Sequence, residues 1–346
     1  MQEYSLDSFL EEISTNPSNV FPTDDDQRRL IKVYLMTASD NWLDMFSSYA
    51  PTKLGEILHF KMPFGDNNDT VDYYAHEIEK GLLMFFTSSK REEYTKTLRN
   101  FVRHRAGINN MWLPPSSFDD VINYIKQKYS ATIYSFTAKR SWSSKHPSEI
   151  RPEFTRLIHY AGDDAGYSLK ELRKQYGVMP TLVDFKIGSD KIRVTNDGLF
   201  LIKTVNRKML RLVEEVVDQV LAEQRRLRNV SQQVDYTKHS LTIGNRQIDT
   251  SSLTAGSIVF TKSLTAPLVD QLFGNFQDAE FGRAEEDEEY SDFSFIDTHV
   301  NEDGSYSATV VDEDKGTIFG LSGNENNMTL IPKHRTTYES FINFYR

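Results

Sequence analysis

Apolar and polar residues recur along this chain with two different periods, and each period predicts a kind of secondary structure. Residues 6–13 place apolar side chains three and four positions apart, which is the spacing of one helix face. Residues 23–36 begin with acids, which favour a helix N-terminus, and continue with the same apolar spacing. Two helices are therefore expected, and residues 1–65 are predicted to form a helical N-terminal region.

The pattern then alternates between short apolar runs and helical stripes. The apolar runs lie at 81–89, 108–115 and 131–140, and they are typical of buried strands. Helical stripes begin at Ser89 and Ser117, where a polar side chain can cap the first turn. Strands that alternate with helices through short connections predict helices that cross over and pack on a sheet.

The periodicity is lost over residues 138–167, which are predicted to be a long irregular segment of the functional or mobile kind. Two strands are expected next, over 181–188 and 191–204. The second contains Asn-Asp-Gly at 196–198, a sequence typical of a hairpin turn. Residues 206–228 carry a sustained apolar stripe and predict a long amphipathic helix.

Together these elements predict an α+β protein with a mixed sheet, packed helices, an N-terminal helical portion and a C-terminal strand-rich unit. At 346 residues the chain is long enough for more than one core. The predicted order is the helical region over 1–65, a central α/β-type domain over 66–275, an acidic linker over 276–292 and a strand-rich unit over 293–346 that ends in a helix.

Charge is distributed unevenly along the chain. The formal net charge is −10, yet the segment Asp278–Asp292 holds eight acids and one base and carries −7 of it, so the other residues sum to about −3. Local charge therefore matters more than the total for any charged partner. The acidic segment is too polar to pack and predicts a linker. The alternative is that this acidic segment folds over a basic groove and inhibits binding there.

Composition narrows the classes of function. Cysteine is absent, which excludes disulfides, thiolate metal sites and cysteine catalysis. No apolar run has the length of a membrane span, and the N-terminus lacks the pattern of a secretory signal, so a soluble cytoplasmic protein with no membrane partner is expected. Nucleotide-binding glycine motifs are missing, and the eight histidines have no ligand spacing, so no cofactor is predicted.

One chemical hypothesis concerns Asp184-Phe185-Lys186. An acid and a lysine two residues apart lie on one face of a strand, where the acid could hold Mg²⁺ and the lysine could steady an attacking water. Asp163 and Asp164 would complete the metal site of such a nuclease. The alternative, which we favour, is a strand with an apolar face at Phe185 and its alternate neighbours and with Asp184 and Lys186 on the wet face.

A second hypothesis is a basic patch with an aromatic residue, which could neutralise phosphates and stack on a base. Its members lie on the helix after Ser89 and in the segment that follows residue 138. They are Lys96, Arg99, Arg103, Lys139, Arg140, Trp142, Lys145 and Arg151. The alternative is an ordinary solvated surface.

The leading functional hypothesis is a non-enzymatic binding or regulatory protein that uses this patch against nucleic acid or another polyanion. The metal-dependent nuclease is the first alternative. A protein-interaction subunit is the second, in which Tyr338, Phe341 and Tyr345 of the C-terminal helix would dock on a partner.

Overall fold

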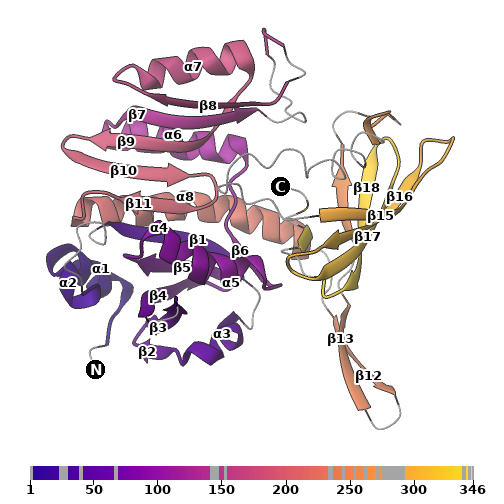
Figure 1. The fold of residues 1–346 in the computed structure, drawn as a ribbon, viewed down its shortest axis with the longest axis horizontal. Coiled ribbons are helices and arrows are strands. Elements are labelled where there is room, and N and C mark those ends of the chain that lie inside the picture. The colour runs from indigo at the N-terminus through magenta and orange to yellow at the C-terminus, as the bar shows by residue number, and fades with distance from the viewer. Residues whose placement is uncertain are drawn as a thin grey trace. The chain divides into compact units, whose positions relative to one another are not determined.

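The computed structural model describes most of the chain (Figure 1). The described residues are 3–22, 30–38, 42–65, 69–140, 148–151, 154–232, 237–243, 246–252, 255–260, 263–265, 267–269, 273, 293–336, 340–341 and 344. They divide into two compact units. Unit 1 comprises Met1–Asn100 and Asn109–Gln224, and unit 2 comprises Phe101–Ile108 and Arg225–Arg346.

Unit 1 combines helices with one large sheet. The helical elements within it or shared at its ends are α1 (Leu6–Thr15), α2 (Pro17–Val20), α3 (Trp42–Met45), the 3₁₀ helix η2 (Ser47–Tyr49), α4 (Arg91–Tyr94), the π-helix η3 (Thr95–Arg99), α5 (Asn100–Arg103), α6 (Pro115–Tyr129), α7 (Ala165–Tyr176) and α8 (Arg207–Gln232). The strands are β1 (Ile31–Ala38), β2 (Thr52–Leu54), β3 (Ile57–Phe64), β4 (Asp69–Glu79), β5 (Leu82–Thr87), β6 (Ile108–Asn110), β7 (Thr132–Arg140), β8 (Arg156–Ala161), β9 (Met179–Ile187), β10 (Asp190–Thr195) and β11 (Leu199–Ile202).

The predicted α+β class is confirmed, but the strands are not arranged as the predicted crossover connections imply. The sheet runs β2-β3-β4-β5-β1-β11-β10-β9-β7-β8, and β6 pairs with β1. The three predicted strands correspond to β5, β6 and β7, and β7 is not a neighbour of β5 or β6 in the sheet. Instead, β7 pairs antiparallel with β8 and β9. An apolar run identifies a buried strand but not its neighbour, because the same run suits either direction of pairing.

The helix predicted over 23–36 is also wrong where the structure describes it. Ile31–Ala38 is β1, a central strand with antiparallel partners β5 and β11, and it is buried along most of its length. A strand covered on both faces has no period-two pattern, so its apolar run could be read as a helix face. The sheet also continues through residue 65, because β3 and β4 on either side of it pair along their length.

The irregular segment predicted over 138–167 contains regular structure. β7 extends to Arg140, and β8 (Arg156–Ala161) returns along it as an antiparallel partner. Residues 141–147 and 152–153 lie outside the described residues. β8 is the last strand of the sheet and its side chains alternate between half-buried and exposed, so the sequence there lacks the apolar contrast of an inner strand.

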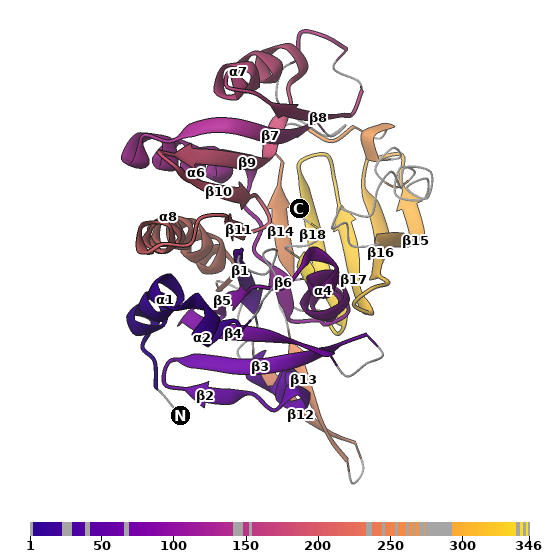
Figure 2. The same ribbon diagram turned by 60° about the vertical axis from the view of Figure 1, so that its left-hand side comes forward.

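One core of unit 1 lies between the sheet and helices on one of its sides, where Figure 2 shows α1, α6 and α8. The predicted stripe of α8 supplies Val213, Val216, Val217 and Val220, each at most 2% exposed. Burying one such side chain fully stabilises a fold by roughly 1.5–3 kcal/mol. This packing fixes which face of β7 and β9–β11 is turned away from the helices.

The predicted hairpin turn at 196–198 is confirmed. It joins β10 to β11, which pair antiparallel. Gly198 has φ +84°, and a Cβ there would lie 3.0 Å from the carbonyl oxygens of Leu35 and Met111. Glycine is therefore required both by the backbone conformation and by the close approach of neighbouring backbone.

Unit 2 confirms the predicted strand-rich C-terminal part. It holds a two-stranded sheet of β12 (Thr237–Ile243) and β13 (Arg246–Ser252) and a five-stranded sheet in the order β14-β18-β17-β16-β15. The five strands are β14 (Gly256–Val259), β15 (Phe293–Val300), β16 (Tyr306–Asp312), β17 (Thr317–Gly323) and β18 (Asn327–His334). A separate aromatic-rich core includes Phe319 and Phe341. Among the helices that the structure describes, none has the length and apolar character needed to cross a membrane.

Candidate functional site

The candidate site is the face of β7 and β9–β11 that is turned away from the helices, which we call the outer face. Val183, Phe185 and Ile187 of β9 all lie in the helix-covered core. Successive side chains of a strand point to opposite faces, so Asp184 and Lys186 belong to the outer face. The register places Arg193 beside Asp184 and Lys191 beside Lys186.

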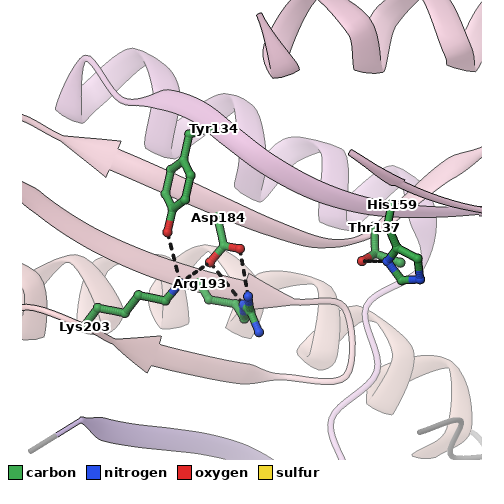
Figure 3. A network of polar contacts seen from close by, with 6 residues as sticks. All are labelled: Tyr134, Thr137, His159, Asp184, Arg193 and Lys203. Carbon is green, nitrogen blue, oxygen red and sulfur yellow. Dashed lines mark hydrogen bonds and ion pairs between the residues drawn. The ribbon is translucent and has the colours of Figure 1, made fainter. Parts of the chain in front are cut away.

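Asp184 is the centre of an ion network on this face (Figure 3). Its carboxylate accepts two hydrogen bonds from Arg193, at 3.1 Å from Nε and 2.9 Å from Nη2, and a third from Lys203 Nζ at 2.9 Å. The Asp184 side chain is 2% exposed, whereas those of Arg193 and Lys203 are 33% and 27% exposed. One buried carboxylate therefore holds two cations that still reach the surface.

Electrostatics in this network favour the ionised acid. Burial alone raises the pKa of Asp184, because it disfavours the charged form. Hydrogen bonds from Arg193 and Lys203 and their positive charges more than offset burial, so the net effect holds the pKa of Asp184 below its usual value. Asp184 is therefore a carboxylate at neutral pH.

A β-bulge adds an aromatic ring to the network. The pairing of β7 with β9 skips Tyr134, because Ile133 faces Phe185 and the next paired residue, Ser135, faces Asp184. The extra residue re-aims the side chain, as bulges do. Lys203 Nζ donates to the Tyr134 hydroxyl at 3.0 Å, and Figure 3 shows this ring above Lys203 and Asp184.

The surface of the outer face is positively charged. Lys186 and Lys191 are exposed, and Lys191 Nζ lies 5.2 Å from the centre of the Tyr134 ring, a cation–π contact. With Arg193 and Lys203 these lysines give four positive charges around one buried negative charge. These five side chains therefore carry a net charge of +3, whereas the whole chain carries a formal net charge of −10.

Lys32 lies on the same side of the sheet but is not part of the available charge. It is 9% exposed on β1, and its ammonium donates to the carbonyl of Ser89. Burial lowers the pKa of Lys32 to about 8, an effect that the nearby Glu93 partly offsets. Its position beneath the surface excludes it from contact with a ligand.

The residues proposed for a nuclease are not arranged as a metal site. Asp184 already binds Arg193 and Lys203, so a cation there would have to displace both. Asp164 accepts hydrogen bonds from the Tyr160 hydroxyl at 2.8 Å and from Ser168 at 3.1 Å. Asp163 is exposed in the turn before α7. Within the described ranges, no group of three or more His, Asp or Glu side chains could hold a metal ion.

The residues of the predicted basic patch fall in different environments. Lys96 is exposed and pairs with Glu92 at 2.7 Å, and Arg103 pairs with Asp314 at 2.7 Å. Arg140 is 4% exposed and donates to the carbonyl of Gly177 at 3.4 Å, so its side chain is buried. Lys139 is half-buried on the outer face of β7, since its neighbour Ala138 lies in the core.

The structure describes two of the four remaining residues of the predicted basic patch. Arg99 is half-buried on η3, and Arg151 is exposed. Trp142 and Lys145 lie outside the described residues, as does the whole acidic segment Asp278–Asp292.

At the C-terminus, Tyr338 and Tyr345 also lie outside the described residues. Phe341 is 9% exposed within the core of unit 2, so it packs on its own unit rather than presenting a docking surface.

Sequence reasoning singled out Asp184 and Lys186 but missed Tyr134, Lys191, Arg193 and Lys203. A signal was available for two of them. The alternation in 191–194 places Lys191 and Arg193 on one face, and the Asn-Asp-Gly turn sets β10 beside β11. The bulge that recruits Tyr134 had no such signal.

Part of this face lies in a stretch of the chain that is similar to a known family model. Residues 116–196 match a family model described as the AF_0896_M family middle domain, a stretch that begins within α6 and continues through β7, β8, α7 and β9 to the end of β10. The chain is also similar to an uncharacterized protein of Archaeoglobus fulgidus, with 24% identity over 298 residues that cover 83% of this chain and 76% of that protein. No solved structure matches.

Proposed function

We propose that this protein is a non-enzymatic binding or regulatory protein whose ligand is a polyanion, with nucleic acid as the leading candidate. The observation that carries the proposal is the cationic outer face, where Lys186, Lys191, Arg193 and Lys203 surround the ring of Tyr134. Lysine and arginine neutralise phosphates and release condensed counterions, which favours binding.

The position of the single acid supports the same proposal. Asp184 is paired with Arg193 and Lys203, whose two positive charges outweigh its single negative charge, so the three groups together attract an anion. The same pairing speaks against metal-dependent hydrolysis, because the carboxylate is committed to two cations of the protein. The outer face therefore supports binding of the ligand better than its cleavage.

Salt dependence gives the proposal a quantitative form. If the four cations contact phosphates of a single strand, the logarithm of the binding constant should fall with the logarithm of salt concentration with a slope of about −3. Removing two of the contacts should make that slope shallower by about 1.4.

The test is fluorescence anisotropy of labelled DNA and RNA with the full chain, titrated at several salt concentrations with magnesium or with chelator. The test variant is Lys186→Ser with Lys191→Ser, since both lysines are exposed. The matched control is Lys53→Ser with Lys170→Ser, which removes two exposed lysines from β2 and α7 of the same unit.

We expect the test variant to bind about tenfold or more weakly, with the shallower slope, and the control to bind like the native protein. Probes should remain intact on a gel with magnesium present. An equal loss of affinity in the two variants would show that the outer face is not the binding site. Shortened probes would show that the protein is a nuclease rather than a binding protein.

A further inference from the structure

The topology of the outer face bears on which form of nucleic acid fits it. It is built from neighbouring strands of a wide sheet, in the order β11-β10-β9-β7-β8. We propose that it binds single-stranded rather than duplex nucleic acid, with one base stacked on Tyr134 and the adjacent phosphates on Arg193 and the lysines. This inference rests on the proposed function and specifies its ligand.

Duplex recognition fits this face poorly. The major groove is about 12 Å wide and admits a helix or a two-stranded ribbon. β9 and β10 have partners on both sides, so neither forms the edge of a ribbon that could enter a groove. A single strand can instead lay its unstacked bases on the face, because every base has a π-surface that an aromatic side chain can bind.

Tyr134 is placed to receive such a base. Its ring stands on the outer face through the bulge in β7, and its hydroxyl is anchored by Lys203 at 3.0 Å. Lys191 now lies over the ring at 5.2 Å, but its side chain is exposed and can move to a phosphate. A stacked base contributes more than an exposed cation–π contact, so the exchange favours the ligand.

Arg193 is oriented in advance for a phosphate. Asp184 holds its guanidinium through Nε and Nη2, which leaves the plane of the group fixed and its further N–H donors available in a side chain that is 33% exposed. Guanidinium groups bind phosphate with two parallel hydrogen bonds when they are oriented in this way. Asp184 is therefore a positioning residue for the phosphate contact.

The experiment compares one labelled sequence as single-stranded DNA, as single-stranded RNA and as a duplex, each with the full chain at one salt concentration. Inorganic phosphate and a mononucleotide are added as competitors, to distinguish a strand from a free phosphate ligand. The variants are Tyr134→Leu and Tyr134→Phe. Tyr167→Leu is the control, because Tyr167 is 65% exposed on α7, which packs on the helix-covered side of the sheet.

We expect single strands to bind at least tenfold more tightly than the duplex, and Tyr134→Leu to lose about tenfold to a hundredfold of that affinity. Tyr134→Phe keeps the ring and should retain most of it, as should the control. Neither free phosphate nor the mononucleotide should displace the strand at equal concentration.

A second measurement avoids the variants, in case Tyr134→Leu does not fold. Irradiation of the native protein with a single strand that contains 5-iodouracil should form a cross-link that peptide mass spectrometry maps to Tyr134. Equal binding of duplex and single strand, or a cross-link only at residues away from the outer face, would overturn the inference while polyanion binding itself stood. If nothing binds, both the inference and the proposed function fail.

Discussion

At the scale of single residues, Asp184 links the stability of unit 1 to the charge of its outer face. The carboxylate is buried, accepts three hydrogen bonds and keeps Arg193 and Lys203 side by side. Without it, two like charges would share one site on the sheet and would repel each other. The acid is thus part of the fold, and it also fixes the positions of two cations on the outer face.

Replacement of this acid should lower stability in a pH-dependent way. For Asp184→Asn we expect the free energy of unfolding at pH 7 to fall by about 2 kcal/mol, a reduced value because both cations are partly exposed. The pKa of Asp184 is lowered in the folded state, so its contribution is present above the unfolded value of about 3.9 and is lost as pH falls through the folded value.

Urea titrations at pH 7 and near pH 3, followed by tryptophan fluorescence, measure this effect. The difference between the native protein and Asp184→Asn should narrow at the lower pH. The exposed Asp163→Asn is the control and should change little at either pH. A difference that is the same at both pH values would show that the network does not stabilise the ionised acid.

At the scale of elements, a buried lysine bonds the 101–108 segment of unit 2 to the turn between β16 and β17. Lys315, in the turn between β16 and β17, is 8% exposed, and its Nζ donates to the carbonyls of Val102 at 2.9 Å, Arg105 at 3.3 Å and Ile108 at 3.0 Å. Carbonyls at the end of a helix lack partners within the helix, and a cation there is favourable. Lys315 therefore ties α5 and the segment after it to the five-stranded sheet.

Substitution of Lys315 should release that segment. Lys315→Met keeps the length of the side chain but removes the ammonium that donates to three carbonyls, which costs roughly 2–3 kcal/mol. Arg103 and Arg105 are exposed in the segment, so trypsin should cleave there several times faster than in the native protein. Lys333→Met on β18, which removes a bond to the Thr309 hydroxyl, is the control. Unchanged cleavage would mean that other contacts hold the segment.

Elements also mark the limits of sequence reading in this protein. The helix stripes of α6 and α8 and the β10–β11 turn were predictable, because their determinants are local: spacing of apolar residues and one glycine. β1 was misread, because burial on both faces erased its alternation. β8 was missed, because an edge strand needs little apolar contrast to remain paired.

At the scale of the whole molecule, the two units can be followed separately. All three tryptophans, Trp42, Trp112 and Trp142, belong to the residues of unit 1. Intrinsic tryptophan fluorescence therefore reports the unfolding of unit 1, which carries the outer face. Circular dichroism reports both units, since each contains strands.

A ligand of the outer face should consequently stabilise the unit that tryptophan reports. At a free strand concentration of 100 times Kd, we expect the free energy of unfolding of unit 1 to rise by about 2.7 kcal/mol, since the ligand binds only the folded state. The Lys186→Ser, Lys191→Ser variant should gain less at the same concentration. A tryptophan-detected midpoint that does not move with ligand would place the binding site elsewhere in the chain.

The sequence by itself determined the α+β class, the amphipathic helices, the β10–β11 turn and the alternation that sets Asp184 and Lys186 opposite Phe185. These follow from interactions between residues close together in the chain. Only the tertiary structure decided that Asp184 is buried, since its partners Arg193 and Lys203 reach it through strand pairing across two turns. The same holds for Tyr134, because a bulge depends on the register of two strands separated by some 50 residues, which no local pattern records.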